Sequence, residues 1–386
     1  MLMENIIYFD NAATTFPKPE DVYLGMDQAY RELGVNVGRG QHRLASKAAN
    51  LMQETRELLL NLFHSENKSI VFTHTATEAL NLLLINLVAM ECNVYISPFE
   101  HNAVTRLLEK FKTTRKINVF ILPFNLQNWD YNYDEIQSMF TAAHPNLMII
   151  SHASNVCGYI SPIFELCGFA KKYRSINVID MCQTAGLLDL DLSTDNIDYA
   201  VFDGHKTLYG PFGIGGIVGK SFVNFEPLIY GGTGVESANQ DMPDLVPERF
   251  EAGSHNIQAI AGLNVALKWI QNNTVAQLYA KEKVNYEMLL TVLNRHDNIK
   301  IISGQDTSKF IGVVSCLFDN YSSDNIGNIL SQRNIAVRTG LHCAPLAHKA
   351  LGTYPAGTVR FSVGWFNSES DFVALDKVLS FIEENS

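Results

Sequence analysis

The sequence lacks the markers of several large protein classes. It has no cluster of lysines and arginines, and 29 basic against 40 acidic side chains give a formal net charge of −11. Because nucleic-acid backbones are bound by clustered Lys and Arg, this balance argues against a nucleic-acid partner. The longest apolar run, ALNLLLINLVAM, contains two asparagines and is well short of the ~20 residues that span a bilayer. We therefore expect neither a nucleic-acid-binding protein nor a membrane protein.

Paired and regularly spaced cysteines are also missing. The six cysteines include no CxxC pair and follow no period, which argues against a disulfide framework and against a zinc site. The first ten residues, MLMENIIYFD, lack the basic start of a secretory signal. These absences predict a protein of the reducing cytoplasm that binds no metal.

What the sequence does contain suits a large α/β enzyme. The chain has 386 residues, 47% of them hydrophobic, and single cores stop growing near roughly 250–300 residues, so two domains are expected. Short apolar runs alternate with helical patterns through the middle of the chain, which is typical of a mostly parallel sheet covered by helices. We predict a large domain over residues 1–265 and a smaller α+β domain over residues 266–386. The N-terminal segment, about 15–20 residues long, is expected to contribute to the small domain or to the active site.

Three of the apolar runs end in polar clusters. HASNVCGYI contains Asn155, VIDMCQTAG contains Asp180 and Gln183, and VFDGHKTLYG contains His205 and Lys206. Ligands of open α/β sheets bind just beyond the carboxyl ends of the parallel strands. The three clusters therefore predict one pocket with a polar lining.

A lysine and an acid give this pocket its chemistry. Lys206 is either a surface cation or a nucleophilic amine that forms a Schiff base. Asp180 favours the second interpretation, because Schiff-base cofactors need an acidic partner for their pyridinium nitrogen. A helix start at THTATEA offers backbone N–H groups and the Thr77 hydroxyl to a phosphate. A capping box of Thr75 with Glu78 is the alternative there, and both can hold at once.

The glycine-rich run GPFGIGGIVGKS does not fit a nucleotide-binding loop. The pattern GxxxxGK[ST] needs glycine at the position of Ile214, and GxGxxG starting at Gly213 needs glycine at the position of Val218. The run instead predicts a glycine-rich turn followed by a strand packed close to its neighbour.

Three further residues are candidates for the site. His101, in SPFEHNAV, is either a core histidine or a flat ring over an aromatic cofactor. Arg360 interrupts the apolar run GTVRFSVGW, where a salt bridge or a bound carboxylate would satisfy its guanidinium. Cys343 lies in VRTGLHCAPLAH, a Gly- and Pro-containing loop that predicts an exposed, reactive thiol. A cation close to it, His342 or another, would favour the reactive thiolate.

Taken together, the motifs resemble the pyridoxal-phosphate-dependent cysteine desulfurases of the class V aminotransferase group, which have fold type I. The resemblance covers nearly the whole chain and rests on these segments in this order: YFDNAATTFPKP, TATEALNL, EHNA, HASNVCG, VIDMCQTAG, GHKTLYGPFGIGG, RFEAGSHN and VRTGLHCAP. It implies the fold type I architecture, with a mostly parallel sheet in the large domain and a small α+β C-terminal domain.

The resemblance also implies a role for each candidate residue. Lys206 would hold pyridoxal 5'-phosphate covalently, with the remaining contacts as follows: Asp180 at the pyridinium nitrogen, Gln183 at the phenolate oxygen, His101 stacked on the ring, and Ala76, Thr77 and His205 at the phosphate. Ser254 would reach the phosphate of a partner subunit, so that a homodimer is expected. Asn155 and Arg360 would receive the substrate carboxylate, and Cys343 would accept sulfur from L-cysteine as a persulfide before an acceptor protein takes it.

Some positions depart from the pattern of that family. Asp203 stands where Ser or Thr is usual, which puts an acid beside the expected phosphate, and His255 stands where Pro is usual. HKTLYGP is one residue longer than the short form, while the Cys343 loop resembles the compact group II type. The alternatives are a selenocysteine lyase acting on L-selenocysteine, another class V aminotransferase or β-lyase, and a non-catalytic relative that kept only the fold.

Overall fold

The computed structural model describes residues 6–37, 40 and 42–385. Its largest sheet has seven strands in the order β2-β10-β9-β8-β7-β3-β4. Their bounds are Ser69–Thr73 (β2), Gly215–Gly219 (β10), Tyr199–Asp203 (β9), Ile176–Asp180 (β8), Leu147–Ser151 (β7), Asn93–Ile96 (β3) and Asn118–Ile121 (β4). β10 is antiparallel to both of its neighbours, and the other strands share one direction. The expected α/β architecture with a mostly parallel sheet is confirmed.

Both faces of this sheet are buried, because adjacent residues of a strand point to opposite sides. Ile150 and Phe202 belong to one apolar cluster, and their neighbours Ile149 and Val201 belong to another. The covering helices are α2 (Arg43–Leu62), α3 (Ala76–Leu87), α4 (Asn102–Thr114), α5 (Tyr133–Ala142), α6 (Ile163–Lys171) and α7 (Ile257–Asn273), and α1 (Glu20–Leu33) packs on the outside of α7 and α2. The core of the protein is therefore built in two layers around one sheet.

β10 confirms the close packing expected from its glycines. A Cβ added at Gly216 would lie 2.6 Å from the carbonyl oxygen of Val71 and 2.7 Å from the Phe202 ring. β2 and β9 thus approach β10 too closely for any side chain at that position.

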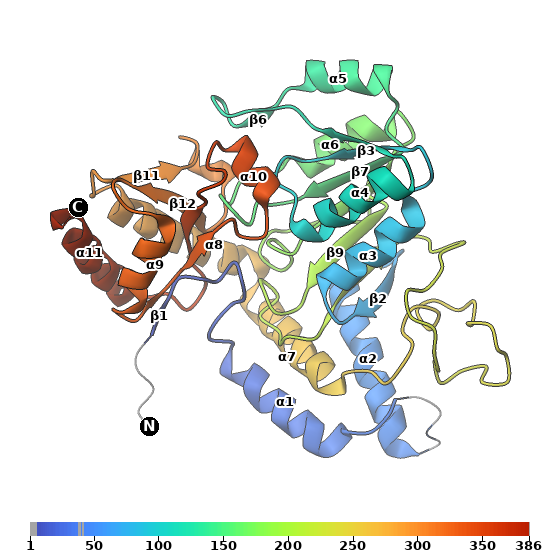
Figure 1. Ribbon diagram of the computed structural model, residues 1–386. Helices are drawn as coiled ribbons and strands as arrows, with labels where there is room; N and C mark the ends of the chain where they lie inside the picture. Colours follow the sequence, from blue (N-terminus) through green and yellow to red (C-terminus); the bar gives the residue numbers. More distant parts are fainter. Residues whose placement is uncertain (1–5, 38–39, 41, 386) are drawn as a thin grey trace.

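A second, four-stranded sheet forms the C-terminal part of the protein. Its strands run antiparallel in the order β11-β12-β15-β14, with bounds Ile299–Ile302, Val313–Phe318, Thr358–Ser362 and Arg338–Gly340. The helices of this part are α8 (Val275–Leu293), α9 (Ser323–Ser331), α10 (Pro345–Ala350) and α11 (Glu369–Glu384). Figure 1 shows this sheet with α8, α9 and α11 on one side of the molecule, while α10 lies next to the large sheet. Residue 265, the domain boundary expected from the sequence, lies inside α7.

Short elements complete the fold. They are β1 (Ile7–Tyr8), which runs parallel to β13 (Ile335–Ala336), the hairpin of β5 (Phe124–Asn125) and β6 (Asp130–Tyr131), and the 3-10 helix η1 (Thr307–Lys309). Through β1 the N-terminal segment joins the C-terminal part, and Thr14 then reaches the loop after β9, where its hydroxyl donates to the carbonyl oxygen of His205 at 2.9 Å. None of the helices in the described ranges has both the length and the apolar character of a membrane span.

Candidate active site

The three polar clusters meet at one edge of the large sheet. β7, β8 and β9 are parallel neighbours, and they end at Ser151, Asp180 and Asp203. A cavity lies beyond these ends, and its lining includes the following residues: Ala76, Thr77, Leu80, His101, Ala103, Ser151, Ala153, Asn155, Asp180, Cys182, Gln183, Asp203 and Lys206. The predicted pocket is therefore present, and seven of the predicted site residues line it.

Lys206 and Asp180 are two of the residues that line this cavity. Lys206 follows β9 in a turn, and its carbonyl oxygen accepts from the hydroxyl of Thr15 at 3.0 Å. No hydrogen bond or ion pair holds its Nζ within the described chain, so the amine is available to a ligand. Asp180 is 9% exposed, and its Oδ1 accepts from the backbone N–H of Cys182 at 3.0 Å. Both side chains line the same cavity, so one ligand can contact the amine and the acid together.

His101 is a neutral, oriented ring. It caps α4, and its Nδ1 accepts from the backbone N–H of Ala103 at 3.1 Å, which places the ring proton on Nε2. Burial lowers the pKa of His101, and the charge of Lys206 lowers it further. A neutral ring is the form that stacks on an aromatic cofactor at the lowest electrostatic cost.

Glu100 is a buried residue that the sequence reasoning missed. It is fully buried, and its Oε1 accepts from Ser97 Oγ and from the backbone N–H of Ser151, each at 2.6 Å. Burial outweighs these bonds and raises the pKa of Glu100 to about 8. An acid directly after the apolar YISPF is the signal that was available, since such a group is costly to bury without a purpose. Its contacts fix the end of β7 next to His101.

The N-terminus of α3 forms another wall of the cavity. Thr75 caps the helix by accepting from Glu78 N at 3.2 Å, so half of the expected capping box is formed. The Glu78 carboxylate accepts instead from His74 N at 3.1 Å. A Cβ added at Gly215 would lie 3.0 Å from Ala76 N, so glycine keeps the approach to this helix start open. Its free N–H groups suit an anion, as the phosphate prediction requires.

His205 reaches the cavity only through Asp203. Its Nε2 lies 3.2 Å from Oδ2 of Asp203, and its ring stacks on Phe212 with a centroid distance of 4.4 Å. Asp203 lines the cavity, and His205 is not among the lining residues. The acid flagged by the sequence is therefore a part of the pocket wall and has a basic partner.

Arg360 lies beside the cavity in β15. It is 1% exposed, and its Nη2 donates to Oδ1 of Asp10 at 2.7 Å while Nη1 donates to the carbonyl oxygen of Asn155 at 2.8 Å. Its Nε is buried without a partner among the described residues. The structural salt bridge is thus present, and one donor remains for a ligand.

Cys343 lies on a strained loop that contacts the cavity residues. Both His342 and Cys343 have positive φ, 47° and 57°. The Cys343 carbonyl oxygen accepts from Asn102 N at 2.7 Å, and the His342 carbonyl oxygen accepts from Nδ2 of Asn155 at 2.7 Å. Cys343 is exposed, whereas the other five cysteines are buried. The predicted exposed thiol is confirmed.

Of the cations expected near this thiol, His342 or another, His342 is ruled out. Burial and the charge of Arg360 lower the pKa of His342 to about 2, so its ring is neutral. The ring is buried, and its Nε2 lies 2.9 Å from Oγ1 of Thr358. Arg338, which is half-exposed and pairs with Asp10 at 2.9 Å, is the arginine of the neighbouring strand β14.

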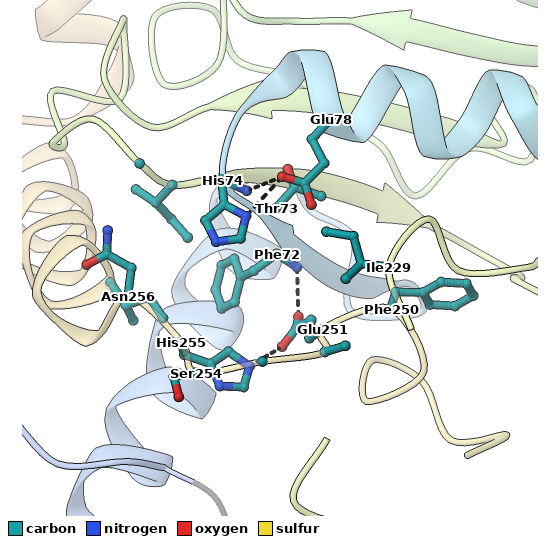
Figure 2. Close-up of a pocket in the computed structure, with 15 residues that line it drawn as sticks. Phe72, Thr73, His74, Glu78, Ile229, Phe250, Glu251, Ser254, His255 and Asn256 are labelled. Atoms are coloured by element: carbon teal, nitrogen blue, oxygen red, sulfur yellow. Dashed lines mark hydrogen bonds and ion pairs between the residues drawn. The ribbon is translucent and has the colours of Figure 1, made fainter. Parts of the chain in front are cut away.

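Ser254 lies outside the cavity of its own chain. Figure 2 shows it with His255 and Glu251 in a neighbouring pocket, next to β2. The Glu251 carboxylate accepts from the backbone N–H of Phe72 at 2.7 Å and lies 3.1 Å from His255 Nε2. Ser254 itself is exposed. The structure therefore does not bring Ser254 together with Lys206 within one chain.

Comparisons with known proteins identify the class to which this fold and site belong. The profile of the aminotransferase class-V family matches residues 7–375, so the chain belongs to that family. This family and its relatives indicate a pyridoxal-phosphate-dependent enzyme.

The individual relatives narrow the class. A probable cysteine desulfurase of Pyrococcus abyssi is 30% identical, and the alignment covers 99% of this chain and 95% of the relative. One from Haemophilus influenzae is 29% identical over 98% and 87% of the two chains. The apo structure of a cysteine desulfurase from Thermococcus onnurineus matches with a TM-score of 0.90 at 28% identity, covering 99% of this chain and 95% of the other. The cysteine desulfurase CsdA of Escherichia coli, in an S-sulfonic acid form, matches with a TM-score of 0.84 at 25% identity over 98% and 95%.

Proposed function

We propose that this chain is a pyridoxal-phosphate-dependent cysteine desulfurase that converts L-cysteine to L-alanine and leaves the sulfur on Cys343 as a persulfide. The observation that carries the proposal is the pairing of a free Lys206 amine with Asp180 in one cavity, while the exposed Cys343 lies on a loop bound to two residues near that cavity. Neither the Lys206–Asp180 pairing nor the exposed Cys343 alone distinguishes a desulfurase from its relatives.

The residues of the cavity offer partners to the aldehyde, the ring nitrogen and the phosphate of pyridoxal phosphate. Lys206 would supply the amine that binds the aldehyde, Asp180 would supply the acid for the ring nitrogen, and the N-terminus of α3 would supply N–H groups for the phosphate. Gln183 lines the same cavity, where its Nε2 already donates to Ala12 O at 2.9 Å. When bound, the cofactor supplies an electron sink for the bond-breaking at the substrate Cα.

The side chains of this protein then handle protons and sulfur. The Lys206 amine would act as the base that takes the Cα proton of the substrate. The Cys343 thiolate attacks the substrate sulfur and forms an S–S bond. The bond between the sulfur and Cβ of the substrate breaks, its electron pair stays on that carbon, and a proton completes the methyl group of alanine.

Substrate binding is assigned to Asn155 and Arg360. Arg360 keeps a buried Nε without a partner among described residues, and a carboxylate is the group that satisfies such a donor most strongly. L-Selenocysteine has the same carboxylate and amine, so the same contacts suit it.

The free, mostly buried cysteines suit a reducing compartment such as the cytoplasm.

The working unit in this proposal is a homodimer. Ser254 is exposed and borders a pocket that also contains Thr73 and Gly213, close in sequence to the α3 start and to β10. From such a surface position it can reach the phosphate end of a partner's cavity. A separate protein would accept the sulfur, because the short Cys343 loop has little freedom to move its thiol.

The proposal is tested by mass spectrometry after incubation with L-cysteine. We expect the mass of added sulfur on the peptide that contains Cys343, with alanine as the co-product. Lys206→Ala should lack the visible absorbance of the lysine-bound cofactor, and Cys343→Ala should keep this absorbance but lose sulfide release. Pyruvate in place of alanine would point to a β-lyase, and a colourless protein that takes up no pyridoxal phosphate would refute the proposal altogether.

A further inference from the structure

Side chains of the N-terminal segment hydrogen-bond to the backbone at His205 and Lys206. Lys18 Nζ donates to the carbonyl oxygen of His205 at 2.5 Å and contacts Thr15 Oγ1 at 2.7 Å. Thr14 Oγ1 donates to the same carbonyl at 2.9 Å, and Thr15 Oγ1 donates to the Lys206 carbonyl at 3.0 Å. The segment therefore brings a cation to the outer side of the pocket wall, where it contacts a residue two positions from Asp203 along the chain.

Asp203, a residue of the cavity wall, has basic side chains near it. Asp203 is 7% exposed, lines the cavity and pairs with His205 at 3.2 Å. Burial lowers the pKa of Lys18 to about 7, and the charge of Asp203 is the influence that opposes this decrease. His205 thus pairs directly with this buried carboxylate, while Lys18, which is bonded to the His205 carbonyl oxygen, acts on it at longer range.

Asp203 creates a problem that the lining residues do not solve. A phosphate monoester carries a charge of about −1.5 to −2 near pH 7. Among the described residues that line the cavity, the basic side chains are His101 and Lys206. Burial lowers the pKa of His101, which favours its neutral form, and the Lys206 amine would be committed to the cofactor aldehyde and so would not be free to pair with the phosphate. The Asp203 carboxylate would then face an anionic ligand with the His205 ring as its direct partner, and an imidazole offsets a negative charge only when it is protonated.

We propose that Lys18 is a positioning residue of the cofactor pocket that neutralises Asp203 and thereby permits phosphate binding in a pocket where an acid replaces a hydroxyl. Lys18 acts through the His205–Lys206 backbone and through the field at Asp203, and it does not touch the cofactor. This inference rests on the proposed function, since it assumes that the phosphate lies at the Asp203 side of the cavity.

A double-mutant cycle measures the interaction directly. Dissociation constants for pyridoxal phosphate are determined by absorbance titration of the cofactor-free protein for the parent, Lys18→Met, Asp203→Asn and the double variant. Removing the cation should weaken binding about tenfold, which corresponds to ~1.4 kcal/mol. The same change should cost less than about twofold when Asp203 is already neutralised, because the two charges are coupled. Lys18→Arg should retain most of the affinity.

Two controls separate charge compensation from a merely structural role. Pyridoxal, which lacks the phosphate, should bind the parent and Lys18→Met with equal affinity. Lys68→Met removes another inward-facing lysine, which donates to Ile197 O at 2.7 Å near the start of β9, at the opposite end of that strand, and it should leave pyridoxal phosphate binding unchanged.

The outcomes distinguish this inference from the proposed function. If Lys18→Met costs the same affinity with Asp203 intact as it does together with Asp203→Asn, the role of Lys18 in charge balance is overturned. Equal losses for pyridoxal and pyridoxal phosphate would overturn it as well. An unchanged affinity in Lys18→Met would do the same while leaving the desulfurase proposal intact. A parent protein that binds neither ligand would defeat the proposed function itself.

Discussion

Arg360 donates from Nη2 to Oδ1 of Asp10 at 2.7 Å, although 350 positions of sequence separate the two residues. The Asp10 side chain also accepts from Nη2 of Arg338 at 2.9 Å. One carboxylate from the N-terminal segment thus holds two arginines of the C-terminal sheet, one buried and one half-exposed. Since Arg360 also donates to Asn155 in the candidate active site, this pair connects the stability of the fold to the shape of the site.

Asp10→Asn should strongly destabilise the protein. The substitution keeps the shape of the side chain but leaves the buried guanidinium of Arg360 without a counter-charge, which costs about 3 kcal/mol. Urea denaturation at pH 7 measures the free energy of unfolding. Asp27→Asn removes the partner of Arg31 in a fully exposed pair and should produce no measurable change. A loss for Asp10→Asn as small as in that control would mean that the buried pair contributes little.

Alkylation of the native protein should modify one cysteine. Cys343 is exposed and the other five are buried, with the thiols of Cys157, Cys167, Cys182 and Cys316 also held protonated because burial raises their pKa. Iodoacetamide at pH 7.5, about one unit below the ordinary thiol pKa, should label Cys343 alone, as read by peptide mass spectrometry. The variant Cys343→Ser should take up no label, and labelling of a second site under native conditions would contradict the burial pattern.

Glu282 should make stability fall as the pH rises from 4.5 to 7. It is buried in α8, accepts from Gly312 N at 2.9 Å, and burial raises its pKa from 4.5 to about 7. Over this window the native state retains a proton that the unfolded chain has released, so the contribution to stability is present below pH 4.5 and lost above 7.

The variant Glu282→Gln isolates this effect. It should melt at a higher temperature than the parent at pH 8, and the difference should disappear at pH 4.5. Glu287→Gln, at an exposed position of the same helix, is the control and should follow the parent at both pH values. If the melting temperatures of Glu282→Gln and the parent differ by the same amount at pH 4.5 and at pH 8, Glu282 is not the source of the pH dependence.

Gly216→Ala should destabilise the large sheet by about 1–3 kcal/mol, because the added Cβ would overlap the Val71 carbonyl oxygen and the Phe202 ring. Gly232→Ala adds the same atom where nothing lies within 4 Å and should cost little. Thermal denaturation followed by circular dichroism compares the two. Equal melting temperatures would show that β2 and β9 can separate to admit the methyl group.

Much of the candidate site was predictable because its residues follow apolar runs directly. Asp180 and Lys206 lie at or just after the ends of buried strands, and parallel strands bring such ends to one edge of the sheet. The same reasoning gave the α3 start with its Thr75 cap. It did not identify Glu100. The acid directly after the apolar YISPF is visible in the sequence, but only its hydrogen bonds to Ser97 and Ser151 show what it does.

The prediction for His342 failed for a physical reason that local sequence does not contain. A histidine next to a cysteine is a cation only if water or an acid stabilises its charge. In the structure the ring lies inside the protein, bonded to Thr358 and near the charge of Arg360, so the neutral form is favoured. The direction of a side chain on a loop with positive φ follows from packing against β15 and not from the identity of its neighbours.

The sequence by itself determined the order of strands and helices and the residues at the strand ends, because these follow from the spacing of apolar residues along a few turns of chain. The tertiary structure alone decided which polar groups meet. Asp10 pairs with Arg360, and Lys18 donates to the carbonyl oxygen of His205, 187 positions away. Such pairs depend on how distant segments cross in space, and burial then sets their charge states, which no local pattern records.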